Sequence, residues 1–191
     1  MTTWIFKGPV SALALTSLAA CGEGQGPSFL KGLSAPSVAL SQADMAFGAV
    51  TLKAPSGFCI DKSSLKQHFA LMARCDAFGV PSAAGTAPVG LITVSFSAIT
   101  DVPSLPSPQD TAKAMDLQQV SDPIEVETGV IFRATGTVPV EGMSARHWRA
   151  TAQIGTQLMG LALFAPEDSA AAQDEGRSIL SAVIAEASAG S

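Results

Sequence analysis

The feature that most constrains what this chain can fold into is an uncharged apolar run near its N-terminus, from Gly8 to Ala20. The run is about 13 residues long, whereas a helix that spans a bilayer needs roughly 20. Small residues close it before a polar stretch, as in an export signal that is later removed. A buried core helix is the alternative, but Pro9 and the lack of an amphipathic period argue against it. We therefore expect residues 1–20 to be a signal peptide.

The signal ends in the sequence Leu18-Ala19-Ala20-Cys21. This pattern resembles the lipobox of bacterial lipoproteins, in which small residues precede an invariant cysteine. The resemblance implies that a signal peptidase cuts before Cys21 and that its thiol carries a diacylglycerol through a thioether. A thiolate is the nucleophile that such an alkylation requires. The alternative is an ordinary secretory signal that happens to contain a cysteine.

Lipidation of Cys21 would determine where the protein works. Each buried methylene contributes roughly 0.8 kcal/mol to membrane binding, so two or three acyl chains give a stable anchor. The membrane is thus one expected partner, and the domain is expected to face the periplasm of a cell envelope. Gly22, not Asp, follows the cysteine. By the sorting rule of enterobacterial lipoproteins, which comes with the resemblance, this favours the outer membrane over the inner.

The charge balance argues against nucleic acid as a partner. The chain contains 11 Lys and Arg against 16 Asp and Glu. Removal of residues 1–20 takes away Lys7 and no acidic residue, so the net charge falls from −5 to −6. Binding to nucleic acid needs clustered cations that displace counterions from the phosphates. A mature chain this acidic is not expected to bind it.

The cysteine count becomes even once Cys21 is lipidated, because three cysteines are present in all. The remaining two, Cys59 and Cys75, would lie in an oxidising compartment where disulfides persist. A bridge between them would close a loop of about 17 residues and stabilise the fold by roughly 3 kcal/mol. We predict this disulfide; the alternative is a pair of buried free thiols.

The chain is expected to be a lipidated cysteine and flexible linker over residues 21–44, followed by a single domain over residues 45–188. Alternating apolar residues between Gly and Pro predict strands, and longer periodic segments predict helices. Residues 63–75 fit a strand, which we favour, or a helix. Strands are otherwise predicted at residues 49–53, 58–60, 91–97, 124–127, 130–136, 145–154 and 157–164, and helices at residues 108–117 and 166–187.

These elements predict an α+β domain, an antiparallel sheet with packed helices and a C-terminal helix. The apolar residues of that helix form one stripe for packing on the sheet, made by Ile179, Leu180, Val183 and Ile184. A hairpin with its turn at Gly155-Thr156 precedes it.

A turn of the P-x-G-F type, Pro55-Ser56-Gly57-Phe58, leads into the second predicted strand. Together with the late hairpin and the C-terminal helix, this turn is similar to the PsbP-like class of small sandwich domains. The resemblance covers about residues 47–187 as a pattern of elements. It implies an α+β sandwich and a role in binding or assembly at a membrane.

Side chains that could bind a metal or carry out catalysis are few. The two histidines, His68 and His147, lack a metal-ligand spacing with another His or Cys, so no metal or other cofactor is expected. Asp61, His68 and Asp76 would converge only if the bridged segment folds back, and they are expected to be solvated. Ser144 and His147 could form a nucleophilic dyad, although the surrounding sequence lacks G-x-S-x-G.

The triplet His147-Trp148-Arg149 is the most informative polar and aromatic cluster. On a strand, Trp148 points to one face, and His147 and Arg149 point to the other. The simplest interpretation places Trp148 in the core with His147 and Arg149 solvated. The alternative is a polar sheet face, continued by Thr151 and Gln153, that binds an anionic group through Arg149.

The sequence therefore predicts a membrane-anchored lipoprotein of the cell envelope, most simply a non-enzymatic binding or assembly module. Its partner would be an envelope protein or another ligand that carries an anionic group for Arg149. A cofactor-independent periplasmic hydrolase using Ser144 and His147 is the alternative. A purely structural lipoprotein is a third possibility.

Overall fold

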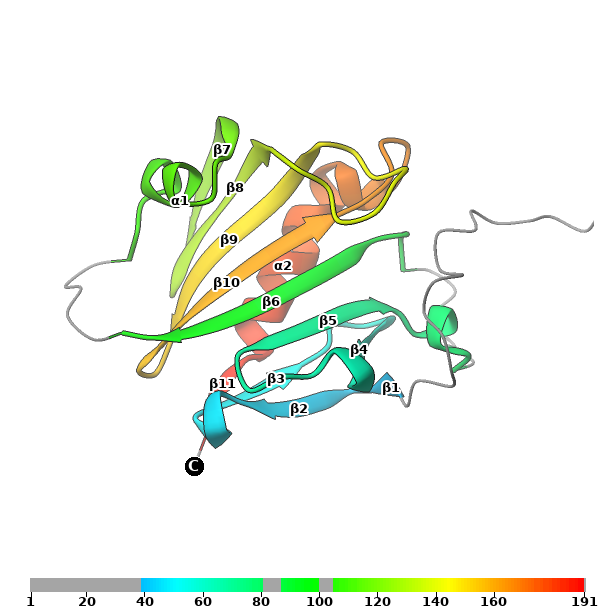
Figure 1. The fold of residues 1–191 in the computed structure, drawn as a ribbon, viewed down its shortest axis with the longest axis vertical. Coiled ribbons are helices and arrows are strands. Elements are labelled where there is room, and N and C mark those ends of the chain that lie inside the picture. Colours follow the sequence, from blue (N-terminus) through cyan, green and yellow to red (C-terminus); the bar gives the residue numbers. More distant parts are fainter. Residues whose placement is uncertain (1–38, 81–86, 100–104, 191) are drawn as a thin grey trace, which may run out of the picture.

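The computed structural model describes residues 39–80, 87–99 and 105–190. The predicted signal peptide, the lipobox and most of the linker lie outside these residues. The main feature is an eight-stranded antiparallel sheet (Figure 1). Its strands lie in the order β1 (Ala39–Leu40), β4 (Phe58–Asp61), β5 (Phe69–Arg74), β6 (Leu91–Ala98), β10 (Gln157–Phe164), β9 (Arg146–Ile154), β8 (Gly129–Thr135) and β7 (Gln118–Val126).

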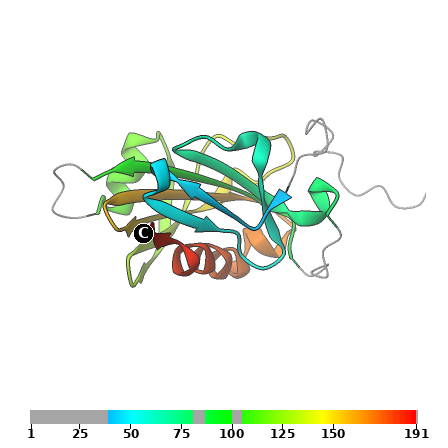
Figure 2. The ribbon, with the colours of Figure 1, turned by 90° about the horizontal axis from the view of Figure 1, so that it is seen from below.

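A second, three-stranded sheet lies beside one face of the first. Its order is β11 (Ser188–Ala189), β3 (Val50–Lys53) and β2 (Gln42–Met45). The same face of the large sheet is covered by helix α2 (Asp174–Glu186), and the short helix α1 (Pro108–Ala114) lies on the opposite side (Figure 2). We call the face under α2 the inner face and the face toward α1 the outer face.

The inner face forms the main core because alternate residues of the central strands are large and apolar. The stripe of α2, made by Ile179, Leu180, Val183 and Ile184, packs on it as predicted. From the sheet the core receives Ile92, Val94 and Phe96 of β6, Trp148, Ala150 and Ala152 of β9, and Met159, Leu161 and Leu163 of β10. Residues of the small sheet, including Val50 and Leu52, complete it.

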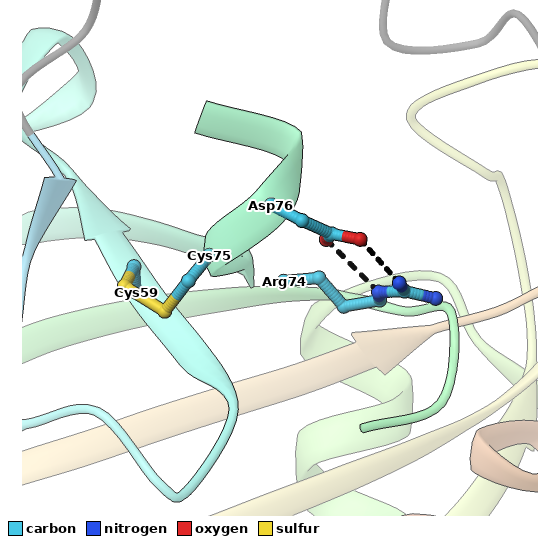
Figure 3. Close-up of a disulfide and its surroundings, with 4 residues drawn as sticks. All are labelled: Cys59, Arg74, Cys75 and Asp76. Atoms are coloured by element: carbon cyan, nitrogen blue, oxygen red, sulfur yellow. Dashed lines mark hydrogen bonds and ion pairs between the residues drawn. A yellow bond between two sulfur atoms is a disulfide. The ribbon is translucent and has the colours of Figure 1, made fainter. Parts of the chain in front are cut away.

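The predicted disulfide between Cys59 and Cys75 is present, with 4.9 Å between the Cα atoms (Figure 3). It joins Cys59 of β4 to Cys75, the residue directly after β5. The segment 63–75, predicted as a strand or a helix, is mainly a strand. Residues 69–74 form a strand, and residues 62–64 form a single 3-10 turn. Next to the bridge, Arg74 and Asp76 form a bidentate ion pair, in which the two opposite charges compensate each other (Figure 3).

The two strands of the hairpin near the C-terminus, β9 and β10, follow the prediction. β9 and β10 pair from Ile154–Gln157 to Trp148–Leu163, and Gly155 at the turn has a φ of 57°. α1 begins at Pro108 as expected, because the Ser107 hydroxyl accepts a hydrogen bond from the Asp110 amide. The fold class predicted from the sequence, α+β with a C-terminal helix, is confirmed.

Several boundaries differ from the prediction, each for a local reason. The helix predicted over 166–187 is α-helical only from Asp174, because Ser169 instead caps a separate 3-10 turn over Ala170–Ala172. The helix predicted over 108–117 ends at Ala114, and Asp116 has a left-handed φ of 52°.

Strand β7 is longer than predicted, and strands β1 and β2 were not predicted. β7 starts at Gln118, six residues before the predicted strand, and its ladder has register shifts with left-handed φ values at Gln119 and Asp122. Residues 39–44, which the sequence analysis placed in the linker, form β1 and most of β2. They do so because Leu40 and Ala43 pack on the core.

No helix in the part of the chain that the structure describes is long and apolar enough to cross a membrane.

Candidate functional site

A groove lies between α1 and the outer face of the large sheet, with a volume of about 520 Å³. Phe69 of β5 forms part of one wall, and Ala114 and Met115 at the end of α1 form part of the other. Pockets that hold small organic molecules usually have volumes of ~300–1,000 Å³. The groove is therefore of a size to bind such a molecule.

The groove exists because the outward side chains at the centre of the sheet are small. Ser95, Gly160 and Thr151 lie side by side on β6, β10 and β9, and Thr93 and Ala162 lie in the adjacent row. A glycine inside a central strand weakens packing and often marks a place where another group comes close to the backbone. At Gly160 the space that a side chain would fill is part of the groove.

At one end of the groove the side chain of Arg149 is held by His147. The Arg149 Nε donates a hydrogen bond to His147 Nε2 at 2.8 Å, and a guanidinium Nη1 lies 3.4 Å from the Met115 sulfur. The His147 ring stacks on Phe164, with 4.4 Å between the ring centroids. The histidine thus holds the guanidinium in one orientation.

The contacts of His147 determine its protonation state. Its Nδ1 lies 2.8 Å from the carbonyl oxygen of Ala145, so this nitrogen carries the proton and donates it. The Nε2 atom must then have a free lone pair to accept from Arg149, which requires a neutral ring. Burial lowers the pKa of His147 to about 4, and the positive charge of Arg149 acts in the same direction, while the Ala145 hydrogen bond opposes them. Geometry and pKa agree that His147 is neutral at pH 7.

The charge of Arg149 is not balanced by a nearby carboxylate in the described part of the chain. No carboxylate oxygen of residues 39–80, 87–99 or 105–190 lies within 4.0 Å of its guanidinium, whereas Arg74, Arg133 and Arg146 each have an acidic partner. Burial lowers the pKa of Arg149, yet a guanidinium keeps its charge at neutral pH. An uncompensated, half-buried cation at the edge of a groove is suited to bind an anion.

Two hydroxyl groups in the groove walls also lack partners. Among the described residues, the Oγ1 atoms of Thr111 and Thr151 are buried and make no hydrogen bond. Thr151 is 5% exposed and follows Arg149 by two residues on the same face of β9. Thr111 is one helical turn before Met115, which contacts the guanidinium. Buried hydroxyls normally find a partner, so these two atoms are exceptions, and both belong to residues that line the groove.

No protein-family model matches this chain, and no curated protein matches it. Among solved structures, the chain is similar to the solution structure of cyanobacterial PsbP (CyanoP) from Synechocystis sp. PCC 6803. The sequence identity is 14% and the TM-score is 0.42, over 90% of this chain and 98% of that one. A likeness this distant does not identify a ligand, so the groove is interpreted from its own residues.

The structure places the other residues that the sequence singled out away from a common site. Both ring nitrogens of His147 have partners other than Ser144, so the two do not form a dyad here. Asp61 is buried and accepts hydrogen bonds from Ser63. His68 packs against Phe47, with 5.4 Å between ring centroids. Within the described residues, no group of three or more His, Cys, Asp and Glu is placed to hold a metal ion.

The polar sheet face predicted from the triplet is present, but its details differ. Trp148 lies in the core, as expected, and donates from Nε1 to the Gln173 carbonyl. His147 is 2% exposed rather than solvated, and Gln153 turns back to the Gly155 carbonyl. The contribution of α1 to the site was not foreseen, since sequence spacing gives no sign that a helix 34 residues away from Arg149 would contact it.

Proposed function

We propose that this protein is a lipid-anchored binding module of the bacterial cell envelope. Cys21 attaches it to the membrane, the outer membrane being favoured over the inner, and the α1 groove takes a ligand whose anionic group is bound by Arg149. The observation that carries the proposal is the guanidinium of Arg149, which is oriented by a neutral histidine and has no carboxylate partner among the described residues. Binding, not catalysis, is the chemistry that this arrangement supports.

The state of His147 also counts against the hydrolase alternative. A general base should have a pKa near the operating pH and should contact the proton it removes. A pKa of about 4 makes His147 a weak base at pH 7, and its free lone pair already accepts from Arg149. His147 therefore acts as a positioning residue for the guanidinium.

The anchor is tested by replacing the proposed lipidation site. In Cys21→Ser cells the protein should move from the membrane fraction to the periplasmic fraction and lose the mass of its acyl groups. The domain should keep its thermal unfolding temperature, because the described core is built from residues between 39 and 190. Retention in membranes with an unlipidated N-terminus would contradict the proposed anchor.

Anion binding is tested on the Cys21→Ser chain with acetate, benzoate and inorganic phosphate as probes. The Arg149 Nε–Hε resonance and the methyl resonance of Met115, which contacts the guanidinium, should shift saturably with at least one probe, and Arg149→Gln should abolish the shift of the Met115 methyl. Arg146→Gln is the matched control, because Arg146 lies on the same strand but pairs with exposed Asp122. Linear, unsaturated shifts for all three probes, the same in both variants, would overturn the proposal.

A further inference from the structure

The two ends of the groove differ in chemistry, which limits the ligands that fit. At one end the Arg149 guanidinium supplies hydrogen-bond donors and has no carboxylate partner among the described residues. At the other end lies the apolar side chain of Leu158 of β10, and Phe69 of β5, which pairs with Ser95, adds an apolar side wall between the two ends. A ligand that satisfies both ends has an anionic head with several acceptor oxygens and an apolar body.

The sheet register gives the length of that body. Ala162 is the β10 residue paired with Arg149, and Leu158 lies four residues along the same strand, on the same face. At a rise of about 3.3 Å per residue, the two ends are ~13 Å apart. An extended chain of about ten carbon atoms spans this distance, given carbon–carbon bonds of ~1.5 Å.

The floor of the groove gives its width. Between the two ends the outward residues are Gly160, Ser95 and Thr151, which form one row across three strands. A Cβ atom at position 160 would lie 2.8 Å from the Ser95 hydroxyl, so a side chain here would fill part of the floor of the groove. We infer that the strip over Gly160 takes a single unbranched chain.

We propose that the groove binds an amphiphilic monoanion, a carboxylate or phosphate attached to one unbranched apolar chain of about ten carbons. The head lies on the Arg149 guanidinium, and the chain follows β10 over Gly160 toward Leu158. This assignment rests on the proposed function, since it specifies the ligand of the same site. A free fatty carboxylate presents this chemistry, and so does an anionic lysophospholipid, a membrane lipid with a single acyl chain.

Asp110 decides between this ligand and a zwitterion. Its carboxylate also lines the groove, on α1, but it is exposed and accepts a hydrogen bond from the Ser107 hydroxyl. An amphiphilic monoanion needs nothing from Asp110, whereas a ligand with a second, cationic group would use it. Asp110→Asn should therefore strengthen the binding of a monoanion, because it removes a like charge, whereas it would weaken the binding of a zwitterion.

The first experiment measures the affinity of the Cys21→Ser chain for a series of carboxylates, from acetate through hexanoate and decanoate to tetradecanoate, below their micelle concentrations. Burial of a methylene contributes a factor of up to about four in affinity. The dissociation constant should fall two- to fourfold per added carbon up to about ten and then level off. Decan-1-ol should bind at least tenfold more weakly than decanoate. An affinity independent of chain length would overturn the proposal.

The second experiment narrows the groove at Gly160. Gly160→Val, made in a Ser95→Ala background to make room for the new Cβ, should remove the gain from chain length while acetate binds as before. Ser95→Ala alone is the control. Should the double variant fail to fold, Leu158→Ser tests the same point from the far end, with an expected loss of about tenfold for decanoate and none for acetate.

The two proposals fail in different ways. If acetate, benzoate and phosphate all fail to shift Arg149, anion binding itself is wrong. If they do shift it, but the affinity for carboxylates depends neither on chain length nor on Gly160→Val, the proposed function stands and the amphiphilic ligand is wrong. Phosphatidylglycerol vesicles with and without lysophosphatidylglycerol separate the two sources: displacement of decanoate only by vesicles that contain the lysolipid indicates a membrane lipid, and no displacement indicates a free amphiphile.

Discussion

The two faces of the large sheet use the same strands in opposite ways. On the inner face, Trp148, Met159 and Leu161 are almost fully buried under α2. On the outer face, their neighbours Arg149, Thr151 and Gly160 are charged, polar or small and line an open groove. A strand has a period of two, so one segment can stabilise a domain with one half of its residues and bind a ligand with the other. The predictions below test that division.

The largest contrast is expected between two glycines, one at each face. A Cβ at Gly176 of α2 would lie 2.1 Å from the Ala171 carbonyl and 2.3 Å from the Trp148 ring. Gly176→Ala should therefore lower the free energy of unfolding by about 3 kcal/mol, because neither the backbone nor a packed indole can move away.

Gly160→Ala on the outer face is the matched substitution, since its one close contact is the Ser95 hydroxyl, which can rotate. Its expected cost is below about 1 kcal/mol. Urea unfolding measures both variants. Equal destabilisation at the two positions would mean that the outer face is packed as tightly as the inner one.

The disulfide belongs to the apolar cluster of the outer face that borders the Arg149 end of the groove. Cys59 and Cys75 pack there with Phe78, Leu91 and Phe164. Replacing both cysteines by serine should lower the free energy of unfolding by about 3 kcal/mol, because the bridge restricts the loop between them in the unfolded chain. Urea unfolding with and without reductant measures this loss. A reduced wild type as stable as the oxidised one would contradict it.

The pH dependence of stability is expected to come partly from His147. Its pKa is lowered from 6.5 to about 4 by folding, so between these values the unfolded chain binds more protons and stability rises with pH. The contribution is present in full above pH 6.5 and is lost as the pH falls to 4, by about 2 to 3 kcal/mol. Unfolding free energies of wild type and His147→Gln should converge toward pH 4. If the unfolding free energies of the two proteins change in parallel from pH 4 to 7, His147 is not held neutral by burial.

The smallest effect is expected for Arg133, the inner-face counterpart of Arg149. Its guanidinium lies 4.3 Å from the centroid of the Trp148 ring and 3.8 Å from the Asp174 carboxylate. Arg133→Met should cost about 1 kcal/mol of stability, because the cation–π contact is lost and the ion pair is exposed on one side. Decanoate binding should not change. A weaker affinity in this variant would show that the two faces are coupled.

The sequence predicted what depends on local pattern. Alternation on β9 separated Trp148 from Arg149, Ser107 and Pro108 indicated the start of α1, and the even pair of cysteines indicated the bridge. These features depend on residues close together in the chain or on chemistry that a single residue type carries.

The rest depends on contacts between distant segments. His147 is buried because Phe164 packs on it, and one wall of the groove comes from α1, which packs on β7 and β8. Neither contact can be derived from the spacing of residues in the sequence. β7 was predicted too short because its first residues, Gln118 to Asp122, are polar and follow no strand alternation. Their pairing with β8 decides their conformation.

Trp148 also gives the molecule a built-in reporter. The sequence contains no tyrosine and two tryptophans, of which Trp4 lies in the predicted signal peptide. A chain processed at Cys21 therefore has one strong fluorophore, fixed between Arg133 and the Gln173 carbonyl under α2. Its emission should shift to longer wavelength when α2 leaves the sheet and should stay constant while the groove on the other face fills. Unfolding and ligand occupancy could thus be followed in one sample as separate optical signals.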